Sequence, residues 1–171
     1  SGKGNSVTVG QLDEALSLLA PTDLIIIGAD LNVNFEPLMA TNSLFTEENE
    51  TWGIPEFDIS RLVPTTTKSL QINSLLLKNG LRACNGRFPS DLQRATTFKR
   101  GHLTSRIDYI LVDLKTWRYI TDFKVDQRAD SDHNSLIVYL KADFISADKL
   151  IPAHKVFPLT LSNNYKAIKW P

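Results

Sequence analysis

Hydrophobic and polar positions alternate along the chain in a way that predicts helices and strands in turn. Apolar residues at helical spacing predict helices over residues 8–20 and 69–79, the second with Ser69 as its N-cap and Gly80 after its end. Short apolar or alternating runs predict strands at residues 24–28, 81–84, 95–98, 106–112 and 135–140. The first of these runs is wholly apolar, which is typical of a strand buried on both faces. This order of elements favours the α/β class.

Composition and periodicity limit the kinds of protein to consider. The chain has 171 residues, 42% hydrophobic and 22% charged, as expected of one globular domain or part of one. Periodicity is lost near the end, so we expect a domain over residues 1–145 and an irregular tail or linker over residues 146–171. No apolar run approaches the roughly 20 residues of a membrane span, and the lone Cys84 excludes an internal disulfide. We therefore expect a nuclear or cytoplasmic protein with no membrane partner.

Charge is balanced overall but unevenly distributed. The chain has 19 basic and 19 acidic residues. Residues 30–58 contain seven acidic and no basic residues, a net charge of −7, whereas residues 78–106 contain seven basic residues and one acidic residue, a net charge of +6. The two segments are either solvated loops that happen to differ, or the basic one forms a surface that meets a polyanion.

Acidic side chains and a histidine stand at the ends of three predicted strands. Asp30 and Asn32 follow the first strand, Asp108 interrupts the fourth, and Asp132 and His133 precede the last. Buried carboxylates are costly unless they are paired, hydrogen-bonded or bound to a metal. Strand-end acids that meet in one cleft favour a Mg²⁺ site. The alternatives are an Asx turn at the first two residues and a structural hydrogen bond between the buried acid and the histidine.

Four short motifs in a fixed order resemble a known superfamily. They are Gly28-Ala29-Asp30-Leu31-Asn32, Thr96-Thr97-Phe98, Ser105-Arg106-Ile107-Asp108-Tyr109 and Ser131-Asp132-His133. In this order they resemble the endonuclease/exonuclease/phosphatase superfamily, the Mg²⁺-dependent phosphodiesterases that include apurinic endonucleases and DNase I-like enzymes. The phrase at residues 84–91, with the second and third motifs, is most similar to the endonuclease domain of non-LTR (LINE-type) retrotransposons. The resemblance covers about residues 8–142 and implies part of the DNase I-like four-layer α/β sandwich.

The resemblance implies a role for each matched residue. Asp30 would interact with the attacking water or the scissile phosphate, and Asn32 would orient that phosphate. Asp108 would buttress His133, which would contact the scissile phosphate. Asp132, together with Asp30, would serve the Mg²⁺ ion. Contacts to the DNA backbone are expected from two matched residues and from the basic segment: Thr97, Arg106, Arg87, Lys99 and Arg100.

The position of the first motif separates this chain from a complete family domain. In the family this motif lies near the middle of the domain, whereas here it begins at residue 28. We therefore expect the carboxy-terminal half of the fold, without the family's metal-binding Glu. Ser135 also stands where the family usually has Pro. Half a sandwich would expose an apolar sheet face. A missing segment, a second copy of the chain, the long loop expected over residues 33–67, the tail or another protein would cover it.

Three functions of different class remain open at this point. The first is a Mg²⁺-dependent endonuclease that nicks DNA and lacks its amino-terminal half. The second is a catalytically inactive, domesticated relic that acts as a protein- or nucleic-acid-interaction module and self-associates. The third is a structural domain in which the polar residues only satisfy one another.

Overall fold

A computed structural model of the chain describes residues 9–34, 50, 53–54, 66–91 and 95–141. The chain divides into two units, one comprising Ser1–Pro21 with Ile145–Pro171 and the other Thr22–Phe144. In the first unit the described residues form helix α1 (Val9–Ser17), which is shorter than the predicted helix over residues 8–20. The tail predicted for residues 146–171 lies outside the described residues, and so does most of the loop predicted for residues 33–67.

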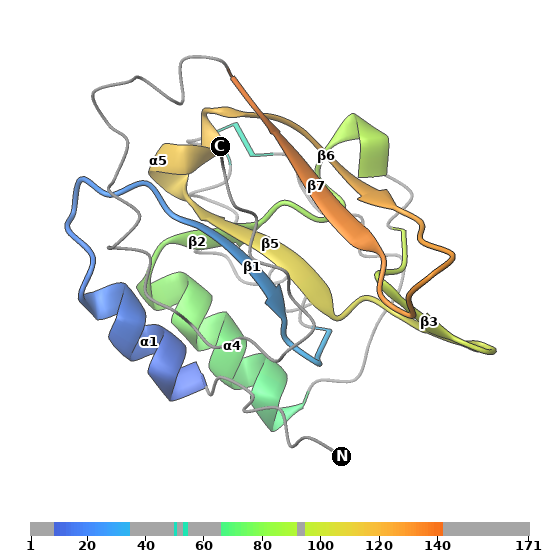
Figure 1. Ribbon diagram of the computed structural model, residues 1–171. Helices are drawn as coiled ribbons and strands as arrows, with labels where there is room; N and C mark the ends of the chain where they lie inside the picture. Colours follow the sequence, from blue (N-terminus) through green and yellow to red (C-terminus); the bar gives the residue numbers. More distant parts are fainter. Residues whose placement is uncertain (1–8, 35–49, 51–52, 55–65, 92–94, 142–171) are drawn as a thin grey trace. The chain divides into compact units, whose positions relative to one another are not determined.

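The second unit combines helices with short antiparallel strands. Its elements are β1 (Ile26–Asp30), α4 (Thr67–Lys78), β2 (Leu81–Ala83), the 3₁₀ turn η1 (Pro89–Asp91), β3 (Phe98–Arg100), β4 (Leu103–Ser105), β5 (Asp108–Asp113), α5 (Leu114–Trp117), β6 (Ile120–Asp126) and β7 (Ser135–Leu140). The strands form one three-stranded sheet in the order β1-β5-β2 and two hairpins, β3-β4 and β6-β7 (Figure 1). A mixed helix and sheet structure is thus confirmed, whereas the four-layer sandwich stays a prediction. Across the described residues, no helix has the length and apolar character needed to cross a bilayer.

Helix α4 begins two residues before the predicted start. Its N-cap is Thr66, whose hydroxyl accepts a hydrogen bond from the Ser69 N–H at 3.1 Å. The Ser69 hydroxyl in turn accepts from the Thr66 N–H at 2.8 Å, which completes a capping box. The prediction of Ser69 as the N-cap is therefore wrong. Ser69 is the third residue of the helix and forms the other half of the capping box. Gly80 follows the helix at a φ of +60°, as the left-handed position after a helix requires.

The strand predictions hold best where the sequence is regular. Strand β7 has the predicted bounds, Ser135–Leu140. The strand predicted at residues 95–98 instead begins at Phe98 and turns back as the hairpin β3-β4 through Gly101, at a φ of +60°. Strand β6 is absent from the predicted strands. Its pairing with β7 shifts register between Ile120 and Asp122, and this irregularity interrupts the alternation of apolar and polar residues.

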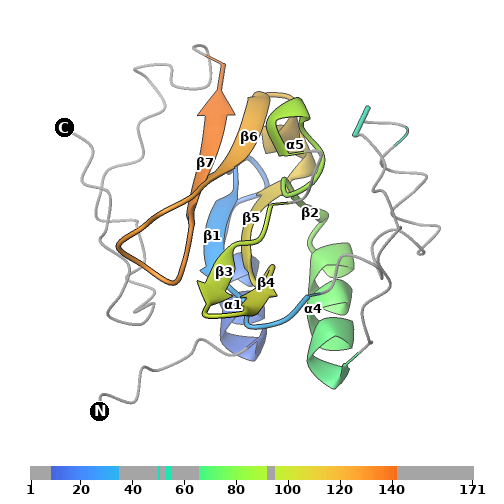
Figure 2. The same ribbon diagram turned by 90° about the vertical axis from the view of Figure 1, so that its right-hand side faces the viewer.

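The core joins strand β5 to the hairpin β6-β7, which lie side by side in Figure 2. Its buried members are Ile54, Cys84, Phe88, Val112, Trp117, Ile120 and Phe123, and partly buried side chains of β5, β6 and β7 pack against them. The Phe88 and Trp117 rings stack with centroids 5.1 Å apart. Burial raises the pKa of the Cys84 thiol above its ordinary range.

Strand β1 is more exposed than its apolar sequence indicates. It lies at the edge of its sheet, where it pairs with β5. None of its five residues is fully buried, and Ile26 is 36% exposed. The prediction of a strand buried on both faces is therefore wrong for the part of the chain that the structure describes. An apolar run does not by itself distinguish a central strand from an edge strand.

Phe123 tests this account of the core. It is fully buried on β6, so Phe123→Ala should lower the free energy of unfolding by about 3–5 kcal/mol through lost burial and a residual cavity. Thr121→Ala, at an exposed position of the same strand, should change it by less than about 0.5 kcal/mol. Urea unfolding measures both, and similar values for the two variants would contradict this assignment of the core.

Candidate active site

The register of β1 with β5 brings two carboxylates together. The strands are antiparallel, and Asp30, the last residue of β1, pairs with Asp108, the first residue of β5. Like charges directly opposite each other on neighbouring strands repel. A site that holds both acids therefore needs a compensating positive group, a proton or a cation.

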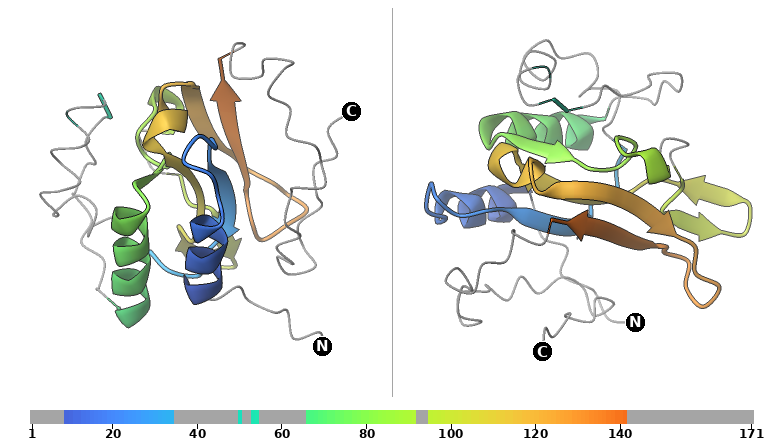
Figure 3. Two further views of the ribbon diagram at one scale, coloured as in Figure 1. Left: turned by 90° about the vertical axis from the view of Figure 1, so that its left-hand side faces the viewer. Right: turned by 90° about the horizontal axis from the view of Figure 1, so that it is seen from above.

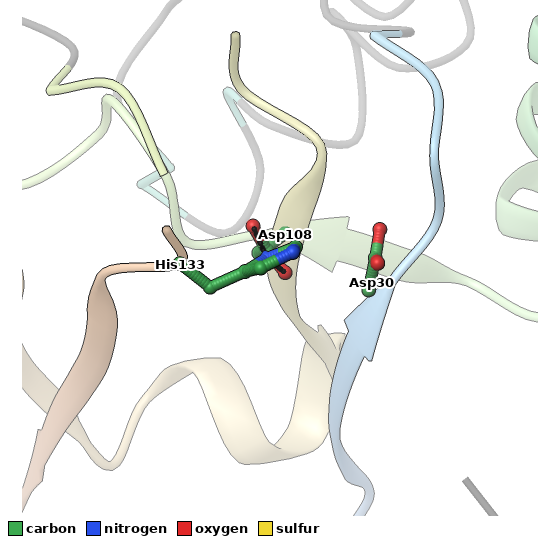
Figure 4. Close-up of side chains that lie close together, drawn as sticks. All are labelled: Asp30, Asp108 and His133. Carbon is green, nitrogen blue, oxygen red and sulfur yellow. Dashed lines mark hydrogen bonds and ion pairs between the residues drawn. The ribbon is translucent and has the colours of Figure 1, made fainter. Parts of the chain in front are cut away.

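His133 is the third member of the group. Its Nδ1 lies 3.1 Å from both carboxylate oxygens of Asp108. One oxygen of each carboxylate and one ring nitrogen of His133 all lie within 4.8 Å of one another. Figure 4 shows the three side chains converging where β1 ends and β5 begins. An ionised carboxylate can only accept a hydrogen bond, so opposite an ionised Asp108 the Nδ1 atom carries a proton.

Backbone contacts with β3 and the residues before it hold the segment that carries His133. His133 forms an isolated antiparallel bridge with Phe98. The Lys99 N–H donates to the Asp132 carbonyl, and the Asn134 N–H donates to the Thr97 carbonyl, each at 2.8 Å. The Phe98 ring also meets the His133 ring edge-on, with centroids 5.0 Å apart. The imidazole therefore points at Asp108 from a segment fixed on both sides.

Two buried polar side chains hold the backbone around Asp108. The Thr97 hydroxyl accepts from the N–H groups of Ile107 and Asp108, each at 3.0 Å. The Asn85 side chain donates to the Asp108 carbonyl and accepts from the Ile110 N–H, each at 3.1 Å. Both side chains have no exposed surface. Sequence reasoning missed Asn85, although an amide beside a buried strand must find partners for its donor and its acceptor.

Burial dominates the electrostatics of Asp108. Loss of solvation raises the pKa of its carboxyl group above the ordinary range, and the negative charge of Asp30 adds to this effect. The hydrogen bond with Thr97 and the charge and hydrogen bond of His133 lower the pKa and so oppose the shift. Thr97 and His133 therefore offset part of the cost of ionising Asp108 in a buried position.

Asp30 and Asn32 form the Asx turn that was the alternative interpretation of these two residues. The Asn32 N–H donates to Asp30 Oδ1 at 2.9 Å, and Asn32 has a φ of +49°, as an Asx turn allows. The turn occupies one oxygen of Asp30 and leaves this carboxylate in the group with Asp108 and His133. The predicted phosphate-orienting role of Asn32 stays a prediction.

Asp132 lies outside this group of three. Its carboxylate pairs with Arg100 at 2.5 Å. This hydrogen bond and the charge of Arg100 lower the pKa of Asp132 below its usual range. In the structure the predicted metal ligand Asp132 is therefore the partner of an arginine.

The predicted DNA contacts separate into exposed and buried residues. Lys99 and Arg100 are exposed on the hairpin β3-β4, which projects from the end of the unit where β5 begins (Figure 3). Thr97, Arg87 and Arg106 are 0%, 2% and 5% exposed. Burial leaves these three side chains little surface for direct contact with a DNA backbone. Thr97 supports Asp108 instead, and Arg106 Nε donates to the Ala95 carbonyl at 3.2 Å.

Asp30, Asp108 and His133 offer few free oxygen ligands for Mg²⁺. Mg²⁺ takes oxygen ligands and is commonly held by one or two carboxylates together with water and substrate phosphates. Both oxygens of Asp108 contact His133, so Asp30 is the carboxylate of this group best placed to ligate a cation. Asp132 could join only after leaving Arg100.

Asn85 offers a test of how the Asp108 backbone is held. Asn85→Ala would leave a buried carbonyl and a buried N–H without partners, so the free energy of unfolding should fall by about 2–4 kcal/mol. Hydrogen exchange at the Ile110 amide should also accelerate. Asn79→Ala removes an amide at the half-buried end of α4 and should cost less than half as much. Equal losses would contradict the role given to Asn85.

The raised pKa of Asp108 predicts a pH dependence with a definite sign. In the folded state the carboxyl group holds its proton to higher pH than in the unfolded chain, so its ionisation destabilises the fold as pH rises above about 4. Asp108→Asn removes this effect, and its stability relative to wild type should therefore be more favourable at pH 7 than at pH 3.5.

Asp130 provides a control of opposite sign for this measurement. Its hydrogen bond with Arg128 lowers the pKa of Asp130, so Asp130→Asn should lose stability relative to wild type, or show no change, over the same pH interval. Urea unfolding at the two pH values measures both variants. The same pH trend in both would rule out burial of Asp108 as the cause.

Comparisons with known proteins find similar solved structures and no match by sequence. No protein-family model matches the chain, and no curated protein matches it. Among solved structures, the endonuclease domain of TRAS1, a telomere-specific non-LTR retrotransposon, is similar with a TM-score of 0.49 and 22% sequence identity. The alignment covers 78% of this chain and 50% of that one, so the chain spans about half the length of that domain. A likeness of this extent assigns no activity.

Proposed function

We propose that the chain forms part of a Mg²⁺-dependent endonuclease of the retrotransposon type, which nicks DNA. Two features support this function: the order of the sequence motifs and the geometry of the candidate site. Four motifs resembling that family occur in order along the sequence, and three of them supply the side chains that meet in the candidate site. The observation that carries the proposal is the contact of His133 Nδ1 with both oxygens of Asp108, with Asp30 within 4.8 Å.

Each residue of the site has its own role in phosphodiester hydrolysis. Asp108 holds the imidazole by Nδ1 and stabilises its protonated form, so Nε2–H can donate to a phosphoryl oxygen as negative charge develops there. Asp30, at the end of the neighbouring strand, accepts a proton from the attacking water as the water oxygen bonds to phosphorus. The bond from phosphorus to the leaving sugar oxygen breaks, and that oxygen takes up a proton from bulk water. A bound Mg²⁺ would neutralise charge on the phosphate, with Asp30 as its ligand from this group. The exposed cations of β3 would bind the flanking DNA backbone.

A second candidate function is an interaction module without catalysis. The limited donor set favours it, because one of the two carboxylates in the described group is engaged with His133. Exposed apolar side chains on two strands, Ile26 of β1 and Tyr139 of β7, offer surface to a second copy of the chain or to another protein. Under this function the polar group persists as a structural hydrogen bond.

Nicking of supercoiled plasmid DNA distinguishes the two functions. The proposal predicts Mg²⁺-dependent nicking that falls at least about 100-fold in His133→Ala and in Asp30→Ala, since each removes a group that transfers or donates a proton. Asp126→Ala removes an exposed strand-end acid outside the group and should leave the rate within about threefold of wild type.

The absence of nicking by the wild-type chain at every Mg²⁺ concentration would refute catalysis by these residues alone. Sedimentation would then test the interaction module, and a monomer at all concentrations would argue against self-association.

A further inference from the structure

An exposed ion pair links the hairpin β3-β4 to the residue before His133. Nη2 of Arg100 lies 2.5 Å from Asp132 Oδ2, and Nε lies 3.2 Å from the same oxygen. The side chains are 74% and 35% exposed, respectively. An exposed pair of this kind contributes little to stability and exchanges readily when another ion competes.

Two sets of contacts connect this ion pair to the candidate site. Asp132 directly precedes His133, and the Asp132 carbonyl accepts from the Lys99 N–H at 2.8 Å. The Arg100 guanidinium also lies 5.7 Å from the centre of the Phe98 ring. The same ring meets the His133 ring edge-on. Because the backbone contact at Lys99 is separate from the ion pair, the Asp132 side chain can leave Arg100 without moving the segment.

Each partner masks the charge of the other. Arg100 offers its guanidinium to Asp132 and so presents less positive charge to an approaching polyanion. A phosphate group competes well for a guanidinium, because two N–H groups can bind two phosphate oxygens at once. DNA that approaches His133 brings such phosphates to the hairpin.

We propose that Arg100 exchanges the Asp132 carboxylate for a backbone phosphate of DNA, so that substrate binding releases Asp132 beside His133. The inference rests on the proposed function, since it requires a phosphodiester at this site. It makes Arg100 a substrate-binding residue whose affinity is limited by Asp132. It also accounts for the position of Asp132 outside the group formed by Asp30, Asp108 and His133.

The chain contains a matched control for this exchange. Arg128 and Asp130 form an exposed pair of the same chemistry, with Nη2 2.5 Å and Nε 2.9 Å from the carboxylate. Its members are two residues apart, and neither belongs to the group of three site residues. Asp130→Asn therefore changes net charge by the same amount as Asp132→Asn without freeing Arg100.

The test measures binding of a fluorescein-labelled blunt DNA duplex by anisotropy in EDTA, where no cleavage occurs. Asp132→Asn should tighten binding about two- to fivefold more than Asp130→Asn, because Arg100 no longer has to leave a carboxylate. In the Arg100→Met background this difference should vanish. A second readout uses the wild-type protein: addition of the duplex should shift the NMR signals of Arg100 Nε–H and of the Asp132 carboxyl carbon together.

The possible outcomes separate the two proposals. Equal tightening by the two asparagine variants in both backgrounds, or an Asp132 signal unmoved by bound duplex, overturns the exchange while leaving DNA binding intact. A wild-type protein that does not bind the duplex overturns the exchange and the proposed function together. A difference that persists in the Arg100→Met background shows that Asp132 repels DNA directly, and this also overturns the exchange.

Discussion

The hydrogen bond between Asp108 and His133 is the interaction on which the candidate site depends. Burial raises the pKa of Asp108 and Asp30 adds a second negative charge, so the ionised carboxylate needs a donor close by. The Thr97 hydroxyl supplies one donor, and His133 supplies another, although 25 residues separate His133 from Asp108 along the chain. The same contact fixes which ring nitrogen is available to a substrate. One interaction thus links the stability of a buried acid to the direction in which the imidazole faces.

Buried polar side chains complete a fold in which strands β2, β3 and β4 have only three residues each. The Asp91 carboxylate accepts from the N–H groups of Gly86 at 2.7 Å and Ala95 at 2.9 Å, while Asn85 and Thr97 bracket the backbone at Asp108. Strands of three residues pair few backbone groups, so side chains must satisfy the others. These residues position the site through the backbone, and their burial makes them poor candidates for direct contact with DNA.

Charge on the surface is arranged in local pairs. Arg100 and Asp132, like Arg128 and Asp130, neutralise each other in the described part of the chain, although residues 78–106 are strongly basic as a segment. A count of charges along the sequence therefore overstates the positive surface offered to DNA, because three of the basic side chains, Arg82, Arg87 and Arg106, are buried and Arg100 is paired. Affinity for a polyanion would depend on which of these pairs can open.

Sequence pattern was enough to predict strands near the site and the residue types placed at their ends. Regular alternation predicted β7, and the apolar run before Asp30 placed that acid at a strand end. Only the tertiary structure decided which side chains meet. Asp132 and His133 are neighbours in sequence, yet one pairs with Arg100 and the other with Asp108. Asp132 lies at a bend and His133 in a bridge with Phe98. Their partners therefore depend on tertiary contacts and strand register, which local pattern does not encode.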